Sequence, residues 1–452
     1  MENILSDHDS VWSRQSHLVG QVTRLLRQRQ RGSIGDPNFQ DLRHTLNFDK
    51  DRPHIAVVTL NEVVNKHGTG IYLGLLFGDL KDTILVRSLS TYDDQRSLVG
   101  DYDFRIFHEF QDRDKAYLKV LNTMGDPFIS HAVCVPLTVS DALNGLAFHD
   151  CFGAKLCTYI MDDPNINSDR IPDNLMNELL GKSDLILAIS QDMREAYQQK
   201  FRFNVGFVPP LVDNALIPTA DQEYSGDPTY PGVLVGNVWG DVWLERLREI
   251  LKTSGILVKW HSNDYRRWWS EHEPRDSASV INISIADDFL EDGLVIPTGG
   301  PLSNTDLISE LRRAPFAIVP TSPLDNEEDT HEFVARLSIP SRVTFIIATS
   351  QTPMIVIGSE NTAVSRFIKK LGVGITIPYD ALQFKGAVEW ISSPEINHLF
   401  RSNAKAIAHK FSSTGAREWI MKSIDEKKPI NDHYEVITQY CPQHKHKTGD
   451  FT

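Results

Sequence analysis

The chain contains only four cysteines among its 452 residues, and no two of them form a Cys-x-x-Cys pair. Zinc sites are commonly built from such pairs, so the cysteine pattern predicts no zinc site and favours a reducing compartment. No apolar run reaches the ~20 residues that a membrane-spanning helix needs. The polar, acidic start of the chain (1–10) lacks the apolar segment of a secretory signal. We therefore expect a cytoplasmic protein that contacts a membrane peripherally at most.

The motifs of several enzyme classes are also missing. The chain has no Gly-x-x-x-x-Gly-Lys-Ser/Thr phosphate loop, no His-Glu-x-x-His zinc motif and no Gly-x-Ser-x-Gly nucleophile turn. Acidic residues outnumber basic ones, with 60 Asp and Glu against 46 Lys and Arg, and the formal net charge is -14. This balance argues against general nucleic-acid binding, which requires a basic surface.

The first fifty residues (1–50) form a separate extension. Apolar residues between Val11 and Leu26 recur at helical spacing, and arginines lie among and after them. The pattern predicts an amphipathic basic helix. Such a helix can pack on the rest of the chain, join a second copy into a homo-oligomer, or lie on an acidic lipid surface, and the sequence leaves these alternatives open.

From Pro53 onward, short apolar runs alternate with helical patterns. Runs such as 54–60 and 155–160 are almost wholly apolar, which is typical of parallel strands covered on both faces. A polar stretch rich in Asp, Gly and Pro ends near Pro231, and the alternation begins again at Gly232. The sequence therefore predicts two doubly wound α/β domains with Rossmann-like parallel sheets, followed by helices. The predicted boundaries are 51–215 for the first domain, 228–395 for the second and 396–452 for the terminal helices.

Ligands of doubly wound sheets bind at the carboxyl ends of the strands, so the cleft between the two domains is the expected site. In the first domain, Gly68, Thr69 and Gly70 follow the first strand and precede a helix, where backbone N–H groups can meet an anion. Asp162 and Asp163 follow a later strand and are candidates for binding a sugar hydroxyl or moving a proton. A tight turn after the first strand and an Asp-Pro turn after the later one are the alternatives.

In the second domain, Gly236, Asn237 and Trp239 follow the first strand, and His261 ends the next one. The glycine segment is a candidate for holding a diphosphate or a base edge. Aromatic residues at this level can stack on a base, or they can belong to the hydrophobic core.

The densest polar cluster of the second domain precedes an apolar helix and consists of Ser338, Pro340, Ser341 and Arg342. A hydroxyl group and an arginine at a helix start suit phosphate, because the guanidinium group offers a charged fork to a diphosphate. Further along, Ser359 and Glu360 end another strand, where Glu360 is a candidate for binding ribose hydroxyls. A surface ion pair for Arg342 and a capped turn at Ser359 are the alternatives.

Several of these segments resemble bacterial glycosyltransferases of the large retaining family four. In the first domain the resemblance is carried by Met161-Asp162-Asp163-Pro164 and by the run from Ser183 to Met193. In the second domain it is carried by Leu337 to Arg342, Thr352 to Gly358 and Thr362 to Gly374. Together these patches span about Pro53 to Ser413.

The resemblance implies a GT-B fold, with a nucleotide-sugar donor on the second domain and an acceptor on the first. It also implies no metal cofactor, because basic side chains and a helix dipole stabilise the diphosphate. The terminal helices are expected to cross back onto the first domain. The sequence departs from the family at the Glu-x7-Glu pair, whose positions fall on Ser338 and Ile346. The family's lysine is Arg342 here, which keeps the charge, and Glu327, Glu328 and Glu332 lie upstream.

The hypothesis that combines these observations is a glycosyltransferase acting on a glycan, lipid-linked or protein acceptor. Arg342 would neutralise the leaving diphosphate, while Asn237, Trp239 and Glu360 hold the nucleotide. Asp162 or Asp163 would orient the acceptor hydroxyl or act as base. Two alternatives remain at this point. One is a non-catalytic GT-B subunit, suggested by the missing glutamate pair, and the other is a sugar-nucleotide epimerase.

Overall fold

The computed structural model describes residues 52–442, apart from 65–67, 90–96, 101, 109–111, 126, 220–225, 262–288, 290–291, 297–301, 327–328 and 330. The predicted N-terminal extension (1–50), a strand expected from Val280 to Ile285, and the upstream residues Glu327 and Glu328 lie outside the described residues.

The first sheet is parallel throughout its described strands, in the order β3-β2-β1-β4-β5-β6-β7. The central strands β1, β4 and β5 are rich in Val, Ile and Leu and are buried over most of their length, because helices cover both faces. The strand bounds are β1 His54–Thr59, β2 Thr83–Arg87, β3 Tyr102–Arg105, β4 Ile129–Val135, β5 Lys155–Ile160, β6 Leu185–Ala188 and β7 Gly206–Phe207.

The second sheet repeats this topology in the order β10-β9-β8-β11-β12-β13, again with parallel pairing. In both sheets the order reverses beside the first strand of the domain, which places the topological switch points at β1/β4 and β8/β11. The strand bounds are β8 Gly232–Val235, β9 Val258–His261, β10 Val295–Ile296, β11 Ala317–Pro320, β12 Met354–Ile357 and β13 Gly374–Ile377.

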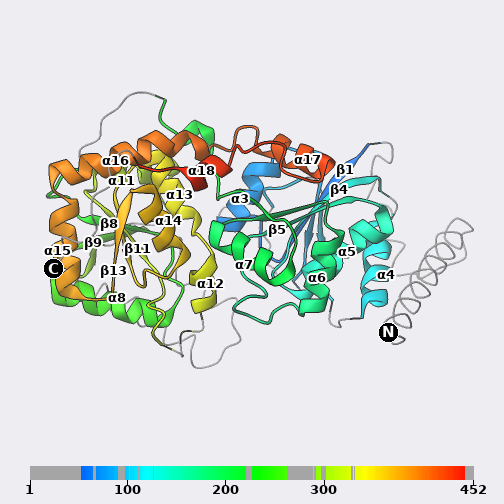
Figure 1. Ribbon diagram of the computed structural model, residues 1–452, viewed down its shortest axis with the longest axis horizontal. Coiled ribbons are helices and arrows are strands. Elements are labelled where there is room, and N and C mark those ends of the chain that lie inside the picture. The colour runs from blue at the N-terminus through cyan, green and yellow to red at the C-terminus, as the bar shows by residue number, and fades with distance from the viewer. Residues whose placement is uncertain are drawn as a thin grey trace, which may run out of the picture.

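Helices flank each sheet on two faces (Figure 1). In the first domain, α4, α5 and α6 pack together on one face, and α3 lies on the other; α7 follows β6. These helices are α3 Gly68–Phe77, α4 Arg113–Met124, α5 Val139–Phe152, α6 Asp173–Lys182 and α7 Gln191–Phe201. The sequence offers Ser190 or Asp192 as the cap of α7, and the structure has Ser190, which accepts a hydrogen bond from the Met193 N–H group.

In the second domain, α8 and α15 cover one face, while α11, α13 and α16 cover the other. Helix α13 is short, but it continues without a break into a π-helical turn, so the predicted helix over Val343 to Thr349 is confirmed. The bounds are α8 Asp241–Ser254, α11 Asn304–Arg313, α12 Glu332–Leu337, α13 Ser341–Phe345, the π-helical turn Ile346–Ser350, α14 Ala363–Leu371, α15 Ala381–Ile391 and α16 Pro394–Ala408.

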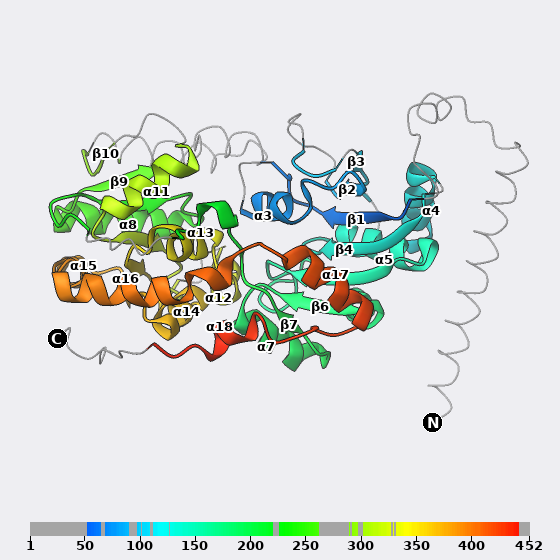
Figure 2. The same ribbon diagram turned by 90° about the horizontal axis from the view of Figure 1, so that it is seen from above.

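After α16 the chain returns to the first domain, where α17 (Ala416–Glu426) packs on β5 and α3 (Figure 2). A short 3-10 helix (His409–Phe411) precedes this return, and a parallel bridge joins Ser412 to Val212. Helix α18 (Glu435–Gln439) lies beside α7, where Glu435 accepts two hydrogen bonds of 2.7 Å from Arg194. The helices thus link the two domains on the side of the β5–β7 strands.

These elements confirm the predicted fold of two doubly wound parallel sheets with terminal helices. No helix in the described part of the chain is long and apolar enough to cross a membrane.

Candidate functional site

Two helix N-termini face each other across the domain junction. Gly68, predicted to lie in a loop, instead begins α3 in the first domain, and Ser341 begins α13 in the second. A Cβ atom added at Gly68 would lie 2.5 Å from the Ser341 Oγ atom, so the absence of a side chain at Gly68 allows this approach. Free N–H groups and the positive ends of two helix dipoles therefore converge at one place.

Arg342 lies in the first turn of α13, beside this convergence. Its Nη1 atom donates to the carbonyl oxygens of Val235, at 2.9 Å, and Asn237, at 2.6 Å. Its buried Nε–H group has no hydrogen-bond partner, and no carboxylate of the described residues forms an ion pair with it. Burial lowers the pKa of Arg342 to about 10. Within the described part of the chain, the guanidinium group is therefore a cation without a paired anion.

The turn after β8 is shaped to receive this arginine. Gly236 has a φ of 79°, which a residue with a side chain rarely adopts, and an added Cβ atom would lie 3.3 Å from Arg342 Nη1. The Gly236 N–H group donates to the His261 carbonyl at 2.8 Å, and its carbonyl accepts from Trp260 Nε1 at 2.8 Å. The next residue, Asn237, has a buried Oδ1 atom without a hydrogen-bond partner in the described structure.

Two other predicted residues of this domain lie in or beside the core. Trp239 is half-buried and packs against the apolar core beneath α8. His261 is 7% exposed, and neither ring nitrogen makes a hydrogen bond within the described part of the chain. Burial lowers the pKa of His261, and the nearest carboxylate oxygen, Glu310 Oε2, is 3.9 Å from its Nε2 atom. The structure therefore joins His261 to the Arg342 site through the backbone of Val235 and Gly236.

In the first domain, Gly70 and Thr69 occupy the first turn of α3. Gly70 is buried, and an added Cβ atom would lie only 2.2 Å from the Glu62 carbonyl oxygen. This glycine is required for close packing of the helix on the preceding segment. Thr69 is half-buried one position earlier.

The structure distinguishes the two adjacent aspartates. The carboxylate of Asp163 is fully buried and accepts hydrogen bonds from the N–H groups of Asn165, Ile166 and Asn167, from the Asn167 side chain, and from the Tyr197 hydroxyl. With five donors it holds the loop after β5 in shape, which favours the Asp-Pro turn interpretation for this residue. The prediction that Asp163 binds a sugar hydroxyl or moves a proton receives no support from this environment.

Asp162, by contrast, is half-buried at the domain junction. Burial raises the pKa of its carboxyl group, while the charge of Arg170 and the hydroxyl of Ser338 act in the opposite direction. Ser338 comes from the second domain, where it is 7% exposed, and its Oγ atom lies 3.4 Å from the Met161 carbonyl. Between Ser338 and α13, Pro340 occupies the N-cap position of the helix. The geometry therefore favours Asp162 over Asp163 as a group that can exchange a proton.

The interactions of Ser359 and Glu360 in the described structure are with their own segment. They follow β12 at the start of α14, where the Glu360 side chain is 68% exposed and pairs with Lys369 at 3.4 Å. The Ser359 hydroxyl accepts a hydrogen bond from the Asn361 N–H group. This environment supports the capped-turn interpretation, and the roles of both residues in ligand binding stay predictions.

A cavity of about 410 Å³ lies between the loop after β5 in the first domain and α12 in the second. Its walls are Asn167 of the first domain and Asp329, Glu332, Phe333 and Arg336 of the second. Of these, sequence reasoning identified only Glu332, and solely as a possible substitute for a missing glutamate. The others carry no local motif, because the cavity arises from the approach of two segments that are distant in sequence.

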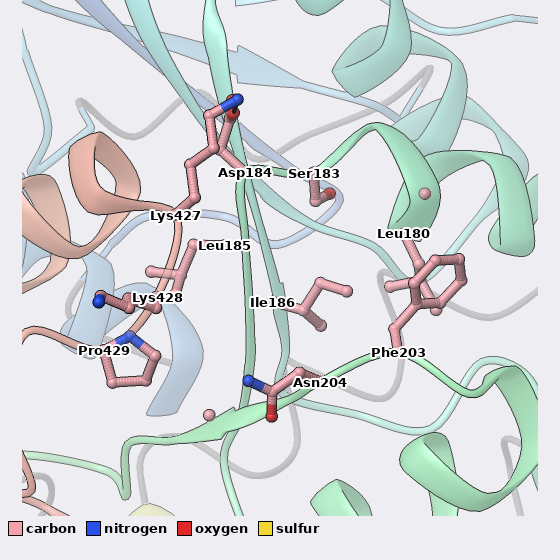
Figure 3. A pocket seen from close by; sticks show the side chains of 12 residues that line it. Leu180, Ser183, Asp184, Leu185, Ile186, Phe203, Asn204, Lys427, Lys428 and Pro429 are labelled. Carbon is pink, nitrogen blue, oxygen red and sulfur yellow. Dashed lines mark ion pairs between the residues drawn. The ribbon is translucent and has the colours of Figure 1, made fainter.

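A second cavity, of about 190 Å³, lies at the opposite, amino end of β6 and β7 (Figure 3). Leu185, Ile186 and Phe203 line it beside Lys427, which pairs with Asp184 at 3.0 Å. Ligands of doubly wound sheets bind at the other end of the strands, and none of the predicted site residues lies here.

Among the residues that the structure describes, no cluster of three or more His, Cys, Asp or Glu side chains is arranged to hold a metal ion. The described site combines the Arg342 guanidinium group with the N-termini of α3 and α13.

No protein-family model and no curated protein matches the sequence. Solved structures match the fold across 82–83% of this chain and nearly all of theirs. Sucrose-phosphate synthase of Thermosynechococcus elongatus is 13% identical with a TM-score of 0.55, over 83% of this chain and 99% of its own. The HepE protein of Anabaena, in complex with UDP and glucose, is 12% identical with a TM-score of 0.57, over 83% and 100%.

A third structure, from E. coli, is described as trehalose-6-phosphate bound with UDP-2-fluoro glucose. It is 10% identical with a TM-score of 0.56, over 82% of this chain and 99% of its own. At these identities the likeness concerns the fold alone. It confirms the predicted architecture: the chain has the two-domain GT-B fold.

Proposed function

We propose that this protein is a glycosyltransferase that moves a sugar from a nucleotide-sugar donor to an acceptor hydroxyl. The observation that carries the proposal is the guanidinium group of Arg342, which has no anionic partner in the described structure and lies where the N-termini of α3 and α13 meet. A diphosphate supplies the missing negative charge. The neighbours support the donor class, since two of them are described with UDP or a UDP-sugar.

The site residues have different roles in the proposed reaction. The Arg342 Nε–H group and the free N–H groups of α13 bind the diphosphate and stabilise the charge that develops as the sugar leaves, in place of a metal ion. Asn237, through its unpaired buried Oδ1 atom, accepts a hydrogen bond from the nucleotide or sugar. Because Gly68 has no side chain, α3 can approach α13 closely, and the free N–H groups of α3 can then also bind the diphosphate.

Asp162 acts as the base in this proposal. The acceptor hydroxyl gives its proton to the Asp162 carboxylate, its oxygen bonds to the anomeric carbon, and the bond from that carbon to the diphosphate oxygen breaks. The products are the glycoside and a nucleoside diphosphate. A raised pKa makes Asp162 a stronger base than an exposed aspartate, which assists the proton transfer.

Thermal unfolding of the full chain against UDP, GDP, ADP and TDP tests the donor site, with and without Mg²⁺. A ligand that binds only the folded state at about 100 times its Kd stabilises it by about 2.7 kcal/mol. We expect one nucleotide to raise the midpoint equally in EDTA and in Mg²⁺, and Arg342→Ala to abolish the rise. The control Arg248→Ala removes an exposed arginine that pairs with Asp292 far from the cleft, and it should keep the full rise. A rise that depends on Mg²⁺ would contradict the metal-independent mechanism.

One observation favours a second candidate, a non-catalytic GT-B subunit. The two positions of the family's glutamate pair hold Ser338, which faces the first domain, and Ile346, which is fully buried. Neither supplies a carboxylate to the donor. Incubation with a sugar nucleotide of the base that the screen selects separates the two candidates. An enzyme slowly transfers the sugar to water and releases the nucleoside diphosphate, whereas a non-catalytic subunit leaves the sugar nucleotide intact.

A further inference from the structure

The cavity between the loop after β5 and α12 is linked to Asp162 through Arg170. Arg170, which acts electrostatically on Asp162, also covers the ring of Phe333, with its guanidinium carbon 4.8 Å from the ring centre. Phe333 in turn lines the cavity. A molecule that occupies this cavity therefore contacts Phe333, whose ring carries the guanidinium group that acts on the carboxyl group of the proposed reaction.

Two of the three charged side chains that line this cavity, Glu332 and Arg336, form an ion pair, whereas the third, Asp329, is held by neutral hydrogen-bond donors. Glu332 pairs with Arg336 one helical turn later, through the Nε and Nη2 atoms of the arginine. The Asp329 carboxylate accepts hydrogen bonds from the Trp243 indole at 2.6 Å, from the Ser322 hydroxyl and from the His331 N–H group at 3.0 Å. An anionic ligand would meet the Asp329 carboxylate, which no cation of the described residues pairs with, so these side chains disfavour a negatively charged occupant.

The same lining suits a neutral molecule with many hydroxyl groups. A paired carboxylate and guanidinium still have free acceptor and donor positions, because each group can make more hydrogen bonds than one ion pair uses. Asn167 donates its side-chain N–H group to Asp163 at 2.9 Å, which fixes its carboxamide at the wall of the cavity. Phe333 adds an apolar ring surface beside these polar groups. The volume falls within the range that small-molecule sites usually have.

We infer that this cavity binds a neutral saccharide acceptor, and that Glu332, Phe333 and Arg336 of the second domain hold it together with Asn167 of the first. The inference rests on the proposed function, and it changes one expectation: the acceptor site does not belong to the first domain alone. The donor diphosphate lies elsewhere, at Arg342, which shares no lining residue with the cavity. The two domains must therefore be in contact for the acceptor to bind.

Saccharide binding to the full chain tests this inference by saturation-transfer NMR and isothermal titration, with and without the nucleotide chosen by the thermal screen. The probes are the neutral disaccharides maltose, lactose and sucrose, with glucuronate and glucosamine as charged comparisons. We expect at least one neutral disaccharide to bind. Glu332→Gln and Phe333→Ala should each weaken that binding at least about tenfold and leave the nucleotide-induced thermal shift unchanged.

The matched control is Glu178→Gln, because Glu178 forms a similar pair with Lys182 one turn later on α6, outside the cleft. It should leave saccharide binding unchanged. Binding of no neutral disaccharide, binding of the charged probes alone, or equal affinity in Glu332→Gln and Phe333→Ala would each overturn the inference. Failure of the proposed function is separate and has a different signature, which is the absence of any nucleotide-induced shift.

Discussion

Asp141 in the first turn of α5 provides a prediction that can be worked through quantitatively. Its side chain is completely buried. The N–H groups of Leu137 and Thr138 and the Thr138 hydroxyl all donate to Oδ2, whereas Oδ1 has no hydrogen-bond partner in the described structure. Burial raises the pKa of Asp141 to about 6, from 3.8. The folded protein therefore binds this proton more tightly than the unfolded chain does.

The sign of the pH dependence follows from that shift. Because the folded pKa is the higher one, the stabilisation is complete below about pH 3.8 and is lost as pH rises through about 6. A shift of about two pKa units corresponds to about 3 kcal/mol of unfolding free energy. The variant Asp141→Asn has no proton to lose there. We therefore expect it to gain stability relative to the wild type as the pH rises.

The measurement is urea unfolding of the wild type and of Asp141→Asn at a series of pH values from about 4.5 to about 8. Subtracting the unfolding free energy of the wild type from that of the variant at each pH removes the contributions of all other titrating groups. It should change by about 2 kcal/mol over this range in favour of the variant, since part of the transition lies below pH 4.5. A difference that is constant with pH would show that Asp141 titrates normally and would refute the reasoning from burial.

Three further predictions concern single residues. Gly70→Ala places a Cβ atom 2.2 Å from the Glu62 carbonyl oxygen and should destabilise the protein by about 1–3 kcal/mol. Gly386→Ala, at an open position of α15, should stabilise the protein by up to about 1 kcal/mol. Equal midpoints of the two variants in thermal unfolding would contradict this contrast. Arg401→Met leaves the carbonyls of Ala314 and Ser350 without their buried donor and should lower the free energy of urea unfolding by about 2–5 kcal/mol. Arg248→Met, which breaks the surface pair with Asp292, should lower it by less than about 1 kcal/mol. Arg366→Ala removes the ion pair with Asp192 between the domains. Added salt should therefore lower the unfolding free energy of the wild type more than that of this variant. An identical salt dependence of the two unfolding free energies would argue against the contact.

The fold could be predicted from sequence where one-sided or wholly apolar patterns mark the elements. Strands such as β1, β4 and β5 and helices such as α7 were identified in this way. Helix α5 was not, because it is buried from Ser140 to Phe148 and so lacks the alternation of apolar and polar faces that identifies a surface helix. Strand β3 was also missed, since its four residues are mostly polar.

The site could be predicted only where its residues form a local pattern. The run of Pro340, Ser341 and Arg342 indicates a helix start, and in the structure Pro340 is the N-cap of α13 while Ser341 and Arg342 are its first residues. Nothing local distinguishes Asp162 from Asp163, because their difference arises from the Tyr197 hydroxyl and the loop N–H groups that fold onto only one of them. Phe333 and Arg170 gave no signal, because their contact depends on how the two domains pack.

The measurement that tests the central claim most directly is isothermal titration of the full chain with the selected nucleoside diphosphate in EDTA, repeated with Arg342→Ala and Arg342→Lys. Loss of a charge-assisted hydrogen bond is worth about 1.5–3 kcal/mol, so Arg342→Ala should bind about 10–150 times more weakly. The affinity of Arg342→Lys should lie between those of the wild type and Arg342→Ala, because lysine keeps the positive charge and lacks the planar guanidinium fork. Wild-type affinity in Arg342→Ala would contradict the assignment of this guanidinium group to the donor diphosphate.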